Sequence, residues 1–264
     1  MLRTTRLFLA AALVLGTLGV TANAQETLVG PLSVPAIVAA PFSAVGVTQT
    51  TRRSADGNRF SRTSTVRFYR DSQGRTRIER QVSLPRLNAN GEQNVLSFIE
   101  IRDPVSNALI MLNPRVKTAM TDTAVHFHTS EPASTMPRVF AQFAGIRIGP
   151  HDRGWSAPLS LGEKSLDGLG AIGTRQVYTI AAGSKFGNEK AVTLTVEQWY
   201  SPTLGMILSR TGTASSGGQT SYHLEQVVQA EPDASLFTIP ADYRKITLPT
   251  RAMAAGAAAA AAAK

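Results

Sequence analysis

Short segments with alternating polarity recur along most of this chain, and they constrain its fold more than any other feature. In Arg59–Arg70, Phe60, Val66 and Phe68 share one parity, while the polar residues at 63, 65 and 67 hold the opposite parity. Alternation of this kind places one set of side chains on a buried face of a strand and the other set on a solvated face. A Gly-containing turn at 71–74 leads into 75–84, which alternates again. The two segments therefore predict a β-hairpin.

Comparable segments continue as far as residue 228. Gly, Pro, Asn and Ser separate them, as at 103–107 and 215–218, and these residues favour turns. Helices do not alternate with the strands, which argues against a parallel nucleotide-binding sheet. Nine or ten short strands at this spacing predict a mainly β chain with an antiparallel sandwich or barrel-like sheet. Nine predicted strands are 44–51, 59–70, 75–84, 95–102, 108–113, 169–181, 190–200, 204–211 and 219–228, and the segment 117–128 can supply one or two more.

One segment has helical periodicity instead. Its apolar residues are spaced by three, one, three and three positions, which places them on one face of a helix. Pro137 suits an early position of that helix. We expect a short lid helix that buries its apolar face against the sheet, followed by a loop over 147–162. The residues of this face are Met136, Val139, Phe140, Phe143 and Ile146.

The first 24 residues have the form of an export signal. Arg3 and Arg6 precede an apolar run of 14 residues at 7–20, and Ala22-Asn-Ala24 has the form of a signal-peptidase site. The run is short for a helix that crosses a bilayer, so the alternative of a membrane anchor is disfavoured. We expect cleavage after Ala24.

The chain contains no cysteine. This absence excludes disulfides, Cys-ligated metals and Cys nucleophiles. It also excludes a bacterial lipid anchor, which requires a cysteine at the cleavage site. We therefore expect a periplasmic or secreted protein that is not membrane-anchored after signal cleavage.

Composition divides the expected mature chain into three parts. Residues 25–43 contain three prolines among small apolar residues and predict an extended lead-in. Residues 44–244 contain the predicted strands and form a single β domain. Residues 245–264 form an Ala-rich low-complexity tail, too short for a stable isolated helix in water.

Positive charge is concentrated in one region. The formal net charge is +9, and +7 remains once the 24-residue signal is removed. Between Arg52 and Arg80 there are nine arginines and three acidic residues, a local charge of +6. This region is interpreted as a solvated hairpin face or as a surface for anionic ligands, with Arg67, Arg75 and Arg77 as its candidates. We expect no nucleic-acid partner, because no binding module is recognisable.

The glycines of Gly168-Leu-Gly-Ala-Ile-Gly173 have the spacing of a dinucleotide-binding motif. Such a motif requires a buried strand before the glycines and a helix after them. Here a polar segment precedes them, and residues 174–180 have the pattern of a strand. We therefore interpret the glycines as easing the start of a strand, and we expect no cofactor.

His126 and His128 are the candidate metal ligands. On a strand, residues two apart share a face and present two imidazoles to one ion. A third ligand requires the fold to bring His151, Asp152, His223 or Glu225 close to them. The chain has no nucleophile motif and no recognisable carboxylate pair, so we expect a binding protein more than an enzyme.

Four segments carry a resemblance to a known family. They are Thr65–Arg77, Ser160–Arg175, the Trp-aromatic-turn segment Glu197–Leu204, and the ending Leu236–Tyr243 with its Phe-Thr-Ile-Pro sequence. In this order they resemble the bacterial lipoprotein-carrier-like (LolA/LolB-like) superfamily over about residues 44–244. That superfamily includes a periplasmic lipoprotein chaperone, its outer-membrane receptor and a lipid-sensing regulator of the envelope stress response.

The resemblance implies an antiparallel half-barrel of about 9–11 strands, closed by one or two short lid helices, whose concave apolar face takes acyl chains. We therefore expect an exported binding protein that holds a lipid, an acyl chain, a lipoprotein acyl chain or another amphiphile. One alternative is an envelope sensor or scaffold that binds another envelope protein. A second alternative is a metal-assisted hydrolase that uses His126 and His128.

Overall fold

The computed structural model describes residues 34–53, 56–87, 90–91, 93–130, 141–143, 146–149, 151, 153–184 and 187–247. The expected signal segment, most of the lead-in and most of the Ala-rich tail lie outside these residues. Met136, Val139 and Phe140 of the predicted helix lie outside them as well. Among the described residues, no helix has the length and hydrophobicity needed to cross a membrane.

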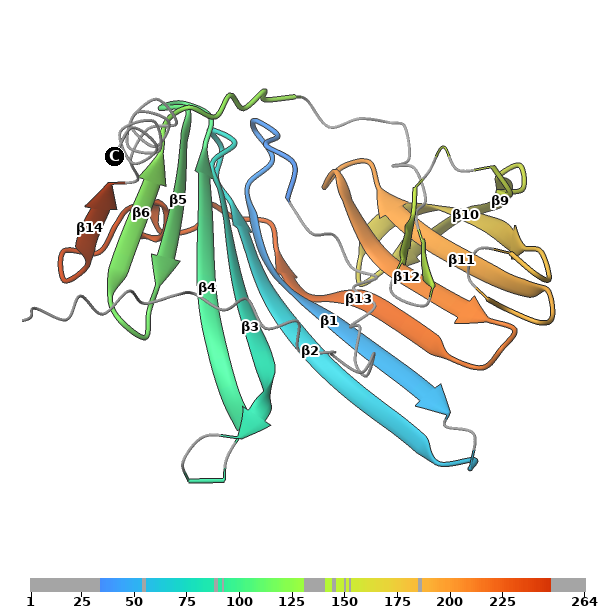
Figure 1. Ribbon diagram of the computed structural model, residues 1–264. Helices are drawn as coiled ribbons and strands as arrows, with labels where there is room; N and C mark the ends of the chain where they lie inside the picture. Colours follow the sequence, from blue (N-terminus) through green and yellow to red (C-terminus); the bar gives the residue numbers. More distant parts are fainter. Residues whose placement is uncertain are drawn as a thin grey trace, which may run out of the picture.

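Twelve strands form one sheet in the order β14-β6-β5-β4-β3-β2-β1-β13-β12-β11-β10-β9, and β7 and β8 form a separate pair (Figure 1). All neighbours in the large sheet are antiparallel except β14, which is parallel to β6. The strands are β1 (Phe42–Arg53), β2 (Arg59–Arg70), β3 (Thr76–Leu87), β4 (Gln93–Asp103), β5 (Ala108–Asn113), β6 (Thr118–Asp122), β7 (Ala141–Phe143), β8 (Ile146–Ile148), β9 (Leu159–Leu166), β10 (Leu169–Ile180), β11 (Val192–Ser201), β12 (Met206–Ala214), β13 (Gln219–Val228) and β14 (Arg244–Thr247).

The large sheet is open, because β9 and β14 are its two edges and do not pair with each other. The mainly β, antiparallel half-barrel that the resemblance implied is thereby confirmed, with twelve strands in its sheet instead of about 9–11. In β1, β11 and β13 buried residues alternate with more exposed ones, as expected for strands with one face in the core.

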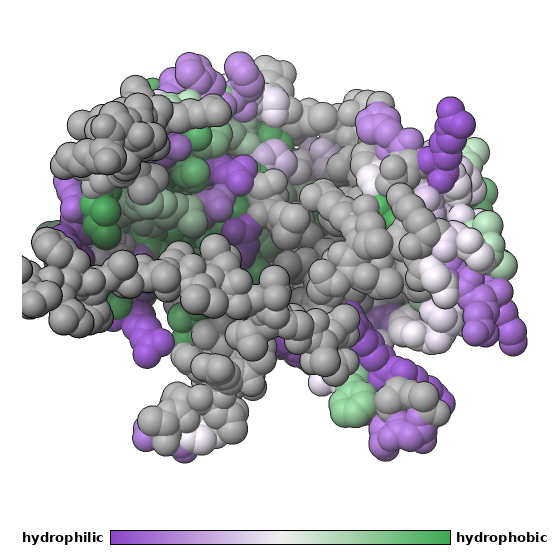
Figure 2. Space-filling model, viewed as in Figure 1, coloured by the Kyte–Doolittle hydropathy of each residue, from purple (hydrophilic) through white to green (hydrophobic). Residues whose placement is uncertain are grey.

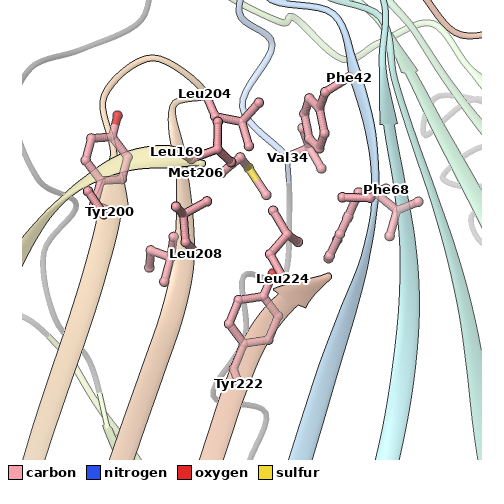
Figure 3. Packing of buried hydrophobic residues seen from close by; sticks show 14 residues of the cluster. Val34, Phe42, Phe68, Leu169, Tyr200, Leu204, Met206, Leu208, Tyr222 and Leu224 are labelled. Atoms are coloured by element: carbon pink, nitrogen blue, oxygen red, sulfur yellow. The ribbon is translucent and has the colours of Figure 1, made fainter. Parts of the chain in front are cut away.

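The sheet curves so strongly that side chains from its two halves pack together on one face. Phe42 and Phe68 come from β1 and β2, whereas Leu208 and Leu224 come from β12 and β13, and all four lie in one buried cluster. Figure 3 shows these side chains converging from the two halves of the sheet. We call this concave side the inner face. Leu204, in the turn between β11 and β12, also joins the cluster and closes it at one end.

The opposite face, which we call the outer face, is covered by a segment that follows β13. After β13 the chain crosses to the far edge of the sheet and adds β14 beside β6 (Figure 1). We call residues 229–243 the strap; they include the 3-10 helix η1 (Ala234–Phe237), which is capped by Asp233. Phe237 of the strap is buried against Ile101 and Leu112 of the outer face.

The helix predicted over 136–146 is wrong from residue 141 onward, where the chain forms the antiparallel pair β7–β8. Phe143 and Ile146, two of the predicted lid residues, are backbone partners in that pair. The spacing of three between Phe143 and Ile146 here joins two different strands, and the glycine at position 145 disfavours a helix interior. Ile148 of β8 is buried with Ile180 and Leu194 of β10 and β11.

Candidate ligand-binding face

One row of paired residues crosses the inner face from β1 to the edge strand β14. Residues that pair across neighbouring strands share a face of the sheet, so their side chains lie next to one another. We call this set the inner row. It consists of Ala44, Phe68, Ile78, Glu100, Met111, Met120 and Ile246.

Burial decreases along the inner row. Phe68 and Ile78 are buried in the cluster of the inner face, Met111 and Met120 are half-buried, and Ile246 is 39 % exposed. Figure 2 shows hydrophobic side chains gathered over β4–β6, between projecting hydrophilic ones. The half of the inner face formed by β4, β5, β6 and β14 therefore presents apolar side chains that the protein covers only in part.

A charged group interrupts this apolar surface. Glu100, 15 % exposed, lies between Ile78 and Met111 in the inner row. Its carboxylate accepts a hydrogen bond from Arg102 Nε at 2.7 Å and lies 3.6 Å from Arg80 Nη1. We call Arg80, Glu100 and Arg102 the inner charge cluster; its net charge is +1. Carboxylate contacts hold both guanidinium groups on the inner face, in reach of an anionic group there.

Sequence reasoning missed the inner charge cluster, although a signal for it exists. Arg80 and Ile78 have the same parity on β3, and Glu100 and Arg102 have the same parity on β4. In the register of this hairpin, Ile78 pairs with Glu100 and Arg80 pairs with Phe98. Only the register, which depends on the loop between the strands, places these charges on the same face as Phe68.

The other half of the inner face contains a buried polar row. Gln198, Arg210 and Tyr222 pair across β11, β12 and β13, and all three are almost fully buried. Burial raises the pKa of the Tyr222 phenol far above its usual value, so the group stays neutral. Its hydroxyl has no hydrogen-bond partner among the described residues. This half of the face is therefore enclosed and contains a polar row beside its apolar cluster, whereas the half over β4–β6 is open and mostly apolar.

Arg70 closes one end of the inner face. Its guanidinium donates hydrogen bonds to the carbonyl oxygens of Pro35, Ala40 and Leu204, and it lies 4.8 Å from the centre of the Phe42 ring. Burial lowers its pKa to about 10, which leaves it charged at neutral pH. This arginine thus ties the segment before β1 to the turn between β11 and β12.

The three candidates for an anionic surface have different environments. Arg67 is exposed. Arg77 is only 8 % exposed and donates hydrogen bonds to Glu79 and to the carbonyl oxygen of Leu236 in the strap. Arg75 bonds to Asp71 and lies over the Phe237 ring of the strap. The expectation of a surface site is therefore wrong for Arg77, because this side chain anchors the strap, and Arg75 also packs against it.

The two candidate metal ligands are exposed and follow β6 without belonging to a strand. The alternation argument that placed His126 and His128 on one face of a strand is therefore wrong. No group of three His, Asp or Glu side chains suited to a metal is present within the described parts of the chain. His223 instead contacts Glu225 at 2.6 Å on β13.

The glycine motif at 168–173 has a structural explanation. Asp167 and Gly168 form the two-residue turn between β9 and β10, and both have positive φ, as a type I′ turn requires. A Cβ on Gly173 would approach the Trp199 ring to 2.6 Å, so the glycine makes room for that ring. The predicted start of a strand is confirmed, and the turn shows that a further strand, β9, precedes it within the segment partly predicted as a loop.

No family model and no curated protein matches this chain. Among solved structures, LprF from Mycobacterium bovis is similar at 13 % identity with a TM-score of 0.32; the match covers 78 % of this chain and 91 % of that one. MucB is similar at 11 % identity with a TM-score of 0.36, over 78 % of this chain and 60 % of MucB.

A LolA superfamily protein from Nitrosomonas europaea is similar at 11 % identity with a TM-score of 0.25, over 75 % of this chain and 90 % of that one. Of these three structures, the last is described as a member of the superfamily that the sequence resembles.

Proposed function

We propose that this chain is an exported, non-enzymatic binding protein that holds the apolar part of an amphiphile, such as an acyl chain, against the open half of its inner face. The observation that supports this most is the inner row, in which Met111, Met120 and Ile246 remain partly exposed. Concave apolar surfaces rimmed by polar groups are typical of ligand sites.

The outer face provides a contrast within the same strands. Leu112 on β5 and Ala119 on β6 point to the outer face and are buried beneath the strap. Their chain neighbours Met111 and Met120 point to the inner face and are not fully covered. The same strands thus have one side buried by the protein itself and one side available to a ligand.

The inner charge cluster suits the polar end of such an amphiphile. Two guanidinium groups and one carboxylate leave a net charge of +1 beside the apolar side chains of the inner row. An anionic head group, a carboxylate or a phosphate, accepts hydrogen bonds from Arg80 and Arg102 while its chain lies along Met111 and Met120.

A fluorescent fatty-acid analogue tests this function. Met111→Trp fills the open half of the inner face, so we expect it to lower the affinity for the analogue at least tenfold. Val116→Trp places the same ring in the exposed turn between β5 and β6 and serves as the matched control. Equal affinities for the two variants, or no uptake by the unmodified protein, would contradict the proposal.

The proposed export has its own test. Expression of the full chain in a Gram-negative host, followed by fractionation and N-terminal sequencing, is expected to give a periplasmic protein that starts at Gln25. A cytoplasmic protein that keeps Met1 would contradict the export while leaving the ligand test unaffected.

A further inference from the structure

The ends of β1 and β2 form an arm that extends beyond the rest of the sheet. Strand β1 pairs with β13 only as far as Thr51, and β2 pairs with β3 only from Val66 to Arg70. The remaining residues of β1 and β2 pair with each other (Figure 1). We call residues 52–53 and 56–62 the arm.

The arm is strongly basic and bears an exposed aromatic ring. Its residues, 52–53 and 56–62, contain four arginines and one acidic residue, a net charge of +3. All four arginines are exposed, and Phe60 is 62 % exposed, a high value for so large an apolar side chain. The four arginines are Arg52, Arg53, Arg59 and Arg62.

The register of the arm surrounds Phe60 with positive charge. Arg52 pairs directly with Phe60 across the two strands, and Arg62 lies two positions further on the same face. On the other face Arg53 pairs directly with Arg59. Two like charges in direct cross-strand positions repel each other, and a bound anion relieves that repulsion.

We propose that the arm docks onto an anionic lipid surface, with its arginines at the phosphates of the head groups and Phe60 in the interfacial layer. Basic residues around an exposed aromatic ring are typical of protein segments that bind such surfaces. A soluble anionic polymer would use the arginines but would give no role to the exposed ring.

The arm also has a position that suits this docking. Phe60 has the parity of Val66 and Phe68 on β2, so it lies on the inner side of the sheet. A membrane that contacts Phe60 therefore lies at the end of the inner face opposite to the one that Arg70 closes. The inference rests on the arm alone and does not depend on the proposed ligand.

Vesicle co-sedimentation of the full chain tests the proposal. We expect binding to vesicles of phosphatidylcholine mixed with phosphatidylglycerol, little binding to phosphatidylcholine alone, and weaker binding as salt is added. The double variant Arg53→Ser/Arg59→Ser should lower the partition coefficient about 25-fold, since each basic residue near an anionic bilayer contributes roughly a fivefold factor. Phe60→Ser should lower it further, and Phe60→Trp should restore it.

The matched control is Arg67→Ser/Lys245→Ser, which removes the same charge from exposed positions outside the arm. An equal loss in this control would show that net charge alone drives binding and would overturn the proposal. Binding of soluble polyphosphate that competes fully with vesicles and is indifferent to Phe60→Ser would also overturn it, in favour of an anionic polymer.

A separate readout keeps this test independent of the ligand test. Arm variants are expected to keep both their circular-dichroism spectrum and their uptake of the fatty-acid analogue. Met111→Trp is expected to keep vesicle binding. Loss of vesicle binding in Met111→Trp as well would contradict a docking surface confined to the arm.

Discussion

Arg70 brings a positive charge into the buried interior of the molecule. It is 0 % exposed, and its charge is balanced by hydrogen bonds to three backbone carbonyl groups. Arg70→Met keeps the approximate size and removes every donor. We expect a loss of about 2–4 kcal/mol in the free energy of unfolding, because three backbone carbonyl groups lose their donor and that of Leu204 is buried. Urea denaturation measures this loss.

Arg70→Lys serves as the control for charge. A lysine keeps the charge but concentrates its donors on one atom, whereas the guanidinium group reaches Pro35, Ala40 and Leu204 in different directions. We expect a stability between those of the Met variant and the unmodified protein. A Met variant as stable as the unmodified protein would show that these hydrogen bonds contribute no net stability.

Gly46 lies on the inner face beneath two rings. A Cβ at this position would approach Phe68 to 2.6 Å and Tyr222 to 2.8 Å, and both rings are buried. We expect Gly46→Ala to destabilise the protein by about 1–3 kcal/mol, because the rings have little room to move. Thermal unfolding measures the effect.

Gly212 is the matched control for Gly46. It also lies within a strand of the large sheet, but its Cβ would meet nothing closer than the Thr220 carbonyl oxygen at 4.0 Å. Gly212→Ala is expected to leave stability almost unchanged or to raise it slightly, since alanine restricts the unfolded chain more than glycine does. Similar losses in both variants would contradict the role assigned to the two rings.

At the residue scale, the sequence predicts the apolar side chains of the buried face but not the buried arginines. Alternation correctly places Phe68 and Ile78 on a buried face, because it depends only on neighbours in the chain. It does not identify Arg70 and Arg77 as buried. Their partners Leu204 and Leu236 lie 134 and 159 residues away along the chain, so only the folded topology brings them together.

At the scale of elements, long strands were predicted better than short ones. The hairpin of β2 and β3 has many alternating positions and a clear turn, and its prediction is confirmed. Segments of three or four residues, such as β7, β8 and β14, have too few positions to define a period. β14 lies in the segment expected to be a tail, and its pairing with β6 depends on the strap.

The strap is the element whose attachment can be tested by a single side chain. Arg77→Met removes the hydrogen bond to the Leu236 carbonyl oxygen and the contact with Glu79. We expect a loss of about 2 kcal/mol in stability, together with faster amide exchange in 231–243. Hydrogen-exchange mass spectrometry reports the exchange, and urea denaturation reports the stability.

Arg67→Met is the matched control for this strap prediction. Arg67 lies in the same hairpin but is exposed, so its replacement should change stability by no more than about 0.5 kcal/mol. The hypothesis that all three candidate arginines serve one surface makes the opposite forecast, namely that neither variant alters the strap. Unchanged exchange in Arg77→Met would favour that hypothesis.

At the scale of the whole molecule, the two faces of the large sheet differ in how they are covered. The strap buries the outer face over β4–β6, while the inner face is buried by the curl of the sheet at one end and remains partly open over the same strands. An open sheet of this size must protect its apolar outer side from water, and here a single connection after β13 does so while adding the edge strand β14.

This arrangement predicts the effect of two truncations. Deletion of 229–264 removes the strap and β14 and keeps every other strand. It uncovers Ile101 and Leu112, which costs about 1.5–3 kcal/mol of folding free energy for each large side chain exposed. Losses of this size, together with the loss of buried Phe237 and of β14, approach the whole stability of a typical domain. We expect an insoluble or unfolded product. Deletion of 248–264 keeps the strap and β14, so it should leave soluble yield and the unfolding midpoint unchanged. A soluble, cooperatively folding product from the longer deletion would show that the sheet is stable without its outer cover.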